Sequence, residues 1–215
     1  MNTASKQGGP YGVWYTIRIM IVADIEATGL DPHKHSLLSI GAIELEHPER
    51  QFYGECRMWE GASIMADALA VNGFTRQECT DPRKHSLEEL MQTFLHWIEQ
   101  CEEKTLAGHN VSFDRDFLND SFARAHIGWH FPYRTLDLHS MAYMDAVKRG
   151  IPVPHKNEHT DFSLDGILRY LGLPEEPKPH IGINGAKYET EAFSRLLYNK
   201  SLLPEFEKYP MLHLS

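Results

Sequence analysis

A short apolar run that ends in two acids constrains this chain more than any other stretch of its sequence. Residues 19–30 read IMIVADIEATGL, and the apolar, β-branched part of this run predicts a buried strand. Alternate residues of a strand face the same side, so Asp24 and Glu26 are expected to present their carboxylates in one direction. Such like charges raise each other's pKa, and a hard divalent cation such as Mg²⁺ or Mn²⁺ removes the conflict. The alternative is an ordinary strand end whose acids point into water.

The composition is that of an ordinary globular protein. The chain has 215 residues, enough for one domain with a substantial core, and 42% of them are hydrophobic. A net charge of −9 argues against strong non-specific binding of nucleic acid by a basic surface. It leaves room for an enzyme that binds a strand end through metal ions and a local groove. The apolar runs are all shorter than the ~20 residues that span a bilayer, so we expect no membrane association.

The cysteines and the chain ends suggest a compartment and domain limits. Cys56, Cys79 and Cys101 are widely spaced and cannot form a complete disulfide framework, so we expect a reduced, cytoplasmic protein. The polar N-terminus lacks the apolar centre of a signal peptide. We predict a flexible arm over residues 1–15, one domain over residues 16–200, and an irregular, loosely packed tail over residues 201–215.

The order of predicted elements indicates the fold class. After the first strand, residues 37–46 and 51–59 predict two more, with a turn over residues 47–50, which together favour an antiparallel meander. Brief strands are expected over residues 105–110 and 134–138. Helices are expected over residues 63–71, 87–100, 112–125, 139–148, 164–171 and 186–199. Residues 150–161 and 174–185 predict loops. This order is typical of one α/β domain, in which helices flank a mixed sheet of antiparallel strands followed by parallel ones.

A second informative stretch, GHNVSFD, occupies residues 108–114. Phe113 and Phe117 can face the core, which leaves Asp114 on an exposed edge of the first helical turn. The helix dipole favours an acid there, so one interpretation of Asp114 is simple stabilisation of the helix. The other interpretation is that Asp114 joins Asp24 and Glu26 in a metal site.

Together, these two stretches resemble the first two motifs of the DEDD superfamily of 3′–5′ exonucleases. Residues 24–30 are similar to the first motif and residues 109–114 to the second. The order of elements is similar over about residues 17–200, and the pattern best fits the DEDDh branch. The resemblance implies an RNase H-like fold and the release of nucleoside monophosphates from single-stranded 3′ ends.

The third motif departs from the family pattern H-x-A-x-x-D, which supplies a general base and the fourth metal carboxylate. Aligning His180 with the histidine puts Gly185 where the aspartate should stand, and Glu189 then lies one helical turn further on. A competing alignment places Asn184 at the histidine and Glu189 at the aspartate, and it loses the base. We favour His180 because it keeps a titratable base. A third interpretation is a catalytically weak domain that binds nucleic acid or serves as a subunit of a processing complex.

The resemblance also implies a set of site residues. Asp24, Glu26, Asp114 and Glu189 would hold two Mg²⁺ or Mn²⁺ ions, and His180 would accept a proton from water. The candidates for contact with the terminal nucleotide are Ala27, Thr28, Leu30, Phe74 and Asn110. Single-stranded DNA and RNA both remain open as substrates, because no motif reports recognition of a 2′-hydroxyl. A homodimer and a larger nucleic-acid-processing complex also remain open.

Overall fold

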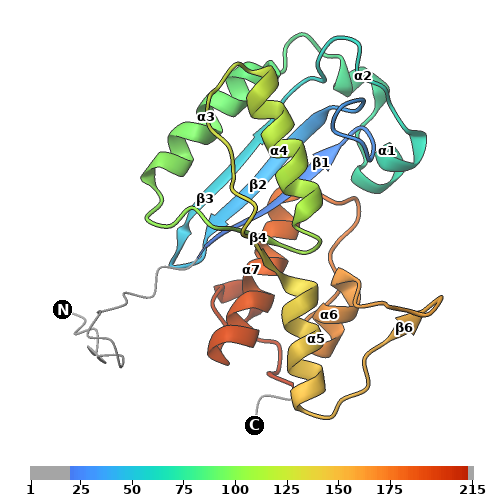
Figure 1. The fold of residues 1–215 in the computed structure, drawn as a ribbon, viewed down its shortest axis with the longest axis vertical. Coiled ribbons are helices and arrows are strands. Elements are labelled where there is room, and N and C mark those ends of the chain that lie inside the picture. The colour runs from blue at the N-terminus through green and yellow to red at the C-terminus, as the bar shows by residue number, and fades with distance from the viewer. Residues whose placement is uncertain (1–19, 213–215) are drawn as a thin grey trace.

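The computed structural model describes residues 20–212, so the predicted arm over residues 1–15 lies outside the described residues. Its centre is a five-stranded sheet in the order β3-β2-β1-β4-β5 (Figure 1). The strands are β1 (Ile21–Ala27), β2 (Leu37–Glu44), β3 (His47–Glu55), β4 (Leu106–Gly108) and β5 (Leu136–Asp137). β2 runs antiparallel to β1 and β3, whereas β4 runs parallel to β1 and β5. The predicted mixed sheet, a meander followed by parallel strands, is confirmed.

Helices cover both faces of this sheet. They are α1 (Ala66–Asn72), α2 (Arg76–Cys79), α3 (Leu87–Gln100), α4 (Ser112–Arg124), α5 (Leu138–Lys148), α6 (Leu164–Tyr170) and α7 (Gly182–Tyr198). In Figure 1, α3 and α4 lie over one face, and α7 passes behind the strands on the other. A small hairpin of β6 (His155–Lys156) and β7 (His159–Thr160) follows α5 in a segment predicted to be a loop.

β1 divides its side chains between two cores. Its odd-numbered residues pack in the cluster that contains α3 and α4, whereas Met20 and Val22 pack in the cluster formed with α5, α6 and α7. Asp24 and Glu26 continue the even-numbered series. Because side chains alternate along a strand, both acids are directed to the α7 side of the sheet.

α7 crosses the sheet at glycines. A Cβ atom added to Gly41 of β2 would overlap the backbone of Gly182, and one added to Gly185 would overlap the carboxylate of Asp24. The predicted loop over residues 174–185 is therefore too long, because α7 already begins at Gly182. These glycines allow close packing of helix on strand and do not mark a flexible connection.

β3 has the nine residues that its sequence predicts, but it covers His47–Glu55 instead of residues 51–59. It begins at His47, so the predicted turn over residues 47–50 is wrong, and the chain turns at residues 45–46 instead. Pro48 lacks a backbone N–H but lies on a strand at the edge of the sheet. The register of β2 and β3 shifts between Ile43 and Glu44, so Pro48 lies in an irregularity of an edge strand, where a proline is tolerated.

Residues 201–212 pack more closely than predicted. Leu203 and Phe206 are buried, and the guanidinium of Arg195 on α7 donates hydrogen bonds to the carbonyls of Phe206, Tyr209 and Pro210. A buried guanidinium needs such acceptors, which is why this segment folds back onto α7. The predicted loosely packed tail is wrong for these residues.

Two features of the described residues bear on the compartment and on membranes. Cys56, Cys79 and Cys101 are all buried and unpaired, as expected. Within residues 20–212, no helix has the length and the apolar content required to span a bilayer.

Candidate active site

β1 carries two carboxylates toward α7. Glu26 is buried, and its pKa is raised to about 8, chiefly by burial and then by the charge of Glu176. Asn72 opposes this shift through a hydrogen bond to the Glu26 side chain. Burial also raises the pKa of Asp24 well above its usual range, and Glu189 and Asp114 raise it further. The interacting groups that shift Asp24 are all acidic, so these carboxylates repel one another.

Asp114 lies on the first turn of α4 and is 4% exposed. The backbone N–H of Ile25 on β1 donates to its Oδ1 at 3.1 Å. The expectation of an exposed edge is therefore wrong, because the first turn of α4 faces the end of β1. Burial raises the pKa of Asp114, the N–H of Ile25 partly offsets that effect, and Glu26 adds to it.

Glu189 enters the same region from α7 and is 2% exposed. Its Oε1 accepts the backbone N–H of His109 at 3.1 Å, whereas its Oε2 is buried without a hydrogen-bond partner. Burial and then the charge of Asp114 raise the pKa of Glu189. Buried polar atoms are rarely left unpaired, so Oε2 of Glu189 is suited to bind a cation.

His180 lines a cavity of about 180 Å³. The residue is half-buried, and its backbone N–H donates to the carbonyl of Val71 at 3.1 Å. Burial lowers the pKa of its imidazole. Phe74 lines the same cavity, so the structure brings these two predicted site residues together.

The other predicted nucleotide-contact residues differ in their exposure and in whether their polar groups already have hydrogen-bond partners. Leu30 is 69% exposed, and Asn110 is exposed with a positive φ of 62°. Thr28 is fully buried, and its N–H, carbonyl and hydroxyl already have partners within the protein. The carbonyl of Ala27 accepts a hydrogen bond from Asn72 at 3.1 Å. Thr28 and Ala27 therefore shape the end of β1 rather than present free polar groups.

Sequence reasoning missed Glu176, a buried acid between α6 and α7. Its Oε2 lies 3.5 Å from Nδ1 of His180, and its Oε1 is buried without a partner. Burial and then Asp165 raise its pKa to about 7. An acid in a segment rich in proline normally faces water, so only its spacing of four residues from His180 could have drawn attention to it.

The donor chemistry of the four predicted ligands fits a hard divalent cation. All four side chains offer carboxylate oxygens, they raise one another's pKa, and one oxygen of Glu189 has no partner. As the side chains stand, no three acidic, histidine or cysteine groups within residues 20–212 converge into a metal-ligand set. The chemistry of these side chains therefore fits a metal, although their positions do not form a compact ligand set.

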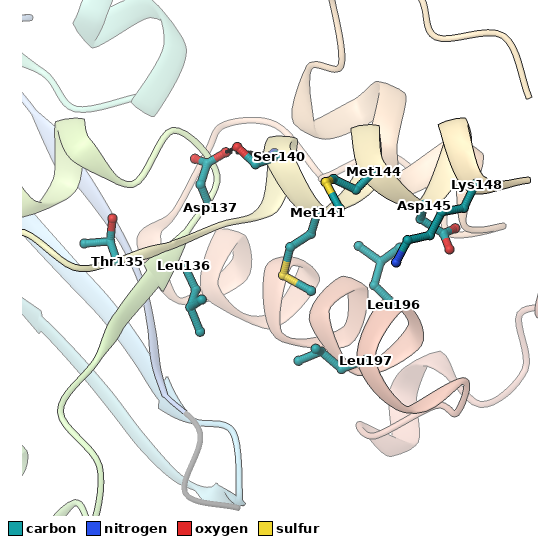
Figure 2. Close-up of a pocket in the computed structure, with 10 residues that line it drawn as sticks. All are labelled: Thr135, Leu136, Asp137, Ser140, Met141, Met144, Asp145, Lys148, Leu196 and Leu197. Carbon is teal, nitrogen blue, oxygen red and sulfur yellow. Dashed lines mark hydrogen bonds between the residues drawn. The ribbon is translucent and has the colours of Figure 1, made fainter.

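A cavity of about 550 Å³ lies between α5 and α7 and contains none of the predicted site residues (Figure 2). Asp137 at its edge accepts hydrogen bonds from Ser140 and, at 3.4 Å, from the backbone of Val111. Asp145 is paired with Arg149 and accepts a hydrogen bond from Tyr170. These acids have protein partners, unlike the open oxygens of Glu176 and Glu189, so the acidic region at β1 is the better candidate.

Comparisons with known proteins bear on the family of this chain. A model of the RNase T exonuclease family matches residues 21–193. Ribonuclease T of Marinobacter nauticus is 27% identical over 183 residues, which span 74% of this chain and 83% of the relative. The 3′–5′ DNA exonuclease Cap18 of Escherichia coli is 28% identical over 180 residues, which span 81% of this chain and 89% of the relative.

Comparison with solved structures supports the fold. The nuclease domain of 3′hExo, a DEDDh family member whose structure contains rAMP, superposes with a TM-score of 0.64 at 17% identity. The match covers 85% of this chain and 92% of that one. The expected RNase H-like fold is therefore confirmed. With the family model matching most of the described residues, the chain belongs to the RNase T family of exonucleases, within the DEDD superfamily of 3′–5′ exonucleases.

Proposed function

We propose that this exonuclease hydrolyses single-stranded ends with the aid of two Mg²⁺ or Mn²⁺ ions and releases nucleoside monophosphates. The proposal is carried by one observation, the mutual repulsion of four acids, Asp24, Glu26, Asp114 and Glu189, that three different elements bring together. Hard divalent cations would remove that repulsion and use the open oxygen of Glu189. One relative is named for RNA and another for DNA, which supports nucleic acid as the substrate class.

The residues of the chain have separable roles in this mechanism. Asp24, Glu26, Asp114 and Glu189 would hold the ions, which when bound supply an activated water and stabilise the leaving 3′ oxygen. Backbone N–H groups already restrain one oxygen of Asp114 and one of Glu189, which limits the rearrangement needed. His180 accepts the proton of the water at an imidazole nitrogen. Burial lowers the pKa of its imidazole, which favours the neutral form that a base requires.

The cavity beside His180 is proposed to receive the terminal nucleotide. Phe74 offers an aromatic face there, and aromatic stacking on bases tolerates any sequence. Leu30 and Asn110 are exposed and available for contact with the sugar and base. This arrangement favours single strands, because a stacked base must be free of its complement.

The experiment is a digestion panel of 5′-labelled single-stranded DNA, single-stranded RNA and dinucleotides, each with Mg²⁺ or Mn²⁺. We expect a ladder that shortens from the 3′ end and releases monophosphates. Blunt duplexes of the same sequence are the control for strand preference, and the two polymers decide between DNA and RNA. A complete lack of shortening of both polymers with either metal would contradict the proposal.

A second candidate function is a catalytically weak module that binds nucleic acid or serves as a subunit. It is favoured by Gly185 at the position where the family supplies an aspartate. Calorimetric titration with Mn²⁺ separates the two functions. The enzyme predicts two binding events, of which at least one is lost in Glu189→Ala, whereas the weak module predicts no such loss.

We also propose a cytoplasmic location and an assembly, either a homodimer or a larger processing complex. Three buried, unpaired thiols are typical of a reducing compartment, which supports a cytoplasmic protein. A homodimer is the simplest assembly to test, and light scattering on the purified protein distinguishes it from a monomer. Co-purification from cell extracts tests the alternative of a larger processing complex.

A further inference from the structure

Glu176 has no role in the mechanism described above, although it is 6% exposed. Its Oε2 lies 3.5 Å from Nδ1 of His180, and its Oε1 is buried without a hydrogen-bond partner. Burying a carboxylate costs free energy unless hydrogen bonds or opposite charges compensate. The imidazole of His180 is the group placed to provide that compensation.

Backbone contacts fix both members of this pair. The N–H of His180 donates to the carbonyl of Val71 on α1 at 3.1 Å. The N–H of Glu176 donates to Oδ1 of Asp165 on α6 at 3.4 Å. The segment that carries both side chains is thus tied to two helices, so the fold itself holds the carboxylate beside the imidazole.

We propose that Glu176 is a positioning residue for His180: its carboxylate accepts a hydrogen bond from Nδ1–H of the imidazole and leaves Nε2 as the basic nitrogen. This inference rests on the proposed function, in which His180 is the general base. A carboxylate on one ring nitrogen fixes the tautomer and the orientation of an imidazole, and it stabilises the imidazolium formed after proton transfer. Contacts of this kind are often long without substrate and shorten when it binds.

Several charged groups surround the pair and must stay constant in any test. Asp165 and Lys178 act on the pKa of His180 in opposite directions. Glu26 of β1 interacts with Glu176, and Glu55 and Glu78 line the cavity beside the imidazole. Substitutions at Glu176 alone leave all of these groups in place.

The test compares Glu176→Met, Glu176→Gln and the matched control Glu175→Met. Methionine removes both acceptor oxygens at similar volume, glutamine keeps one acceptor oxygen without the charge, and Glu175 is an exposed neighbour paired with Arg169. Nitrogen-15 NMR of the full-length, metal-free protein reads the tautomer of His180. Steady-state kinetics on an oligonucleotide give kcat and KM, and calorimetry gives the affinity for Mn²⁺.

We expect the wild-type ring to carry its proton on Nδ1 and the Glu176→Met ring to lose this preference. We expect kcat to fall on the order of 10- to 100-fold in Glu176→Met and less in Glu176→Gln. KM should be unchanged, and so should the activity of the Glu175→Met control. Weakened Mn²⁺ binding with an unchanged tautomer would overturn the inference, because Glu176 would then act on the metal. A wild-type protein that hydrolyses nothing overturns the proposed function, whereas unchanged His180 resonances overturn the positioning role.

Discussion

Gly185 lies directly against the carboxylate of Asp24, and any side chain at that position would overlap it. In the alignment that begins at His180, the family pattern has an aspartate at this position, where α7 lies too close to β1 to admit one. Glu189 lies one helical turn further along α7 and reaches the same acidic region, where the N–H of His109 restrains it. Glu189 is therefore the acid that α7 supplies to this region, whichever alignment of the third motif holds.

Restoring the family's aspartate is expected to damage the protein. Gly185→Asp would force apart α7 and Asp24, and overpacking of this kind typically costs about 1–3 kcal/mol. We expect a lower melting temperature and lower exonuclease activity. Gly128→Asp is the control, because a Cβ atom at Gly128 has no neighbour within 4 Å. Higher activity in Gly185→Asp would contradict the inference that the contact between Gly185 and Asp24 is needed for function.

Glu189→Gln should raise the stability of the metal-free protein and lower its activity. Glutamine keeps the acceptor for the N–H of His109 but removes one of the repelling charges. We expect the metal-free variant to be more stable than wild type at pH 8, with kcat lowered about 100-fold or more through the loss of a metal ligand. Thermal melts and initial rates measure the two effects, and Glu175→Gln is the exposed control. Equal losses of stability and activity would indicate a merely structural role for Glu189.

The sequence predicts the acidic pair on β1 well because alternation along a strand is a strong local rule. Asp24 and Glu26 follow Met20 and Val22 on one face, and nothing beyond the strand is needed to place them. The helix expected over residues 87–100 is likewise found as α3, and Ser86 and Glu89 form a capping box at its start. These features depend on neighbours within a few residues.

The features that the sequence does not predict depend on distant contacts. Asp114 looks exposed on its own helix and becomes buried only because Ile25 lies beneath it. The sequence around Gly182 predicts a loop, because nothing in it shows that the backbone of Gly182 packs against Gly41 of β2. Glu176 is buried because the segment before α7 is tied to α1 and α6. A single sequence carries little information about such packing.

The metal-free protein is expected to lose stability as the pH rises from about 5 to 8. The pKa of Glu26 is raised from 4.5 to about 8, and that of Glu176 from 4.5 to about 7. In this window the folded state binds protons that the unfolded state releases, so the free energy of unfolding falls as pH rises. A difference of one pH unit between folded and unfolded pKa values corresponds to about 1.4 kcal/mol, so the loss should reach a few kcal/mol.

Thermal melts at pH 5.5, 7 and 8 with a chelator measure this trend, and added Mn²⁺ should reverse it at pH 8. Glu26→Gln should flatten the curve, because it removes the group with the higher of the two pKa values. A metal-free protein that becomes more stable toward pH 8 would contradict the burial of these acids.

Two substitutions distinguish the alternative alignments of the third motif. His180→Ala should lower kcat on the order of 10²- to 10⁴-fold, as expected for a lost general base, and leave Mn²⁺ binding intact. Asn184→Ala, on the first turn of α7, should change kcat little. Single-turnover rates and calorimetry measure both. The reverse result, with Asn184 essential and His180 dispensable, would favour the alignment without a histidine base.

The last prediction concerns the ion pair between Arg195 and Glu191, which holds residues 201–212 onto α7. Both side chains have no exposed surface, and their Nε and Oε1 atoms are 2.8 Å apart. The other oxygen of Glu191 accepts the N–H groups of Leu202 and Leu203. Arg195→Met leaves this buried acid without its cation, which typically costs about 3–5 kcal/mol. Urea denaturation measures the loss, and Arg169→Met, which removes an exposed pair with Glu175, should cost at most about 1 kcal/mol. Equal effects of the two substitutions would mean that this C-terminal segment does not depend on the buried pair.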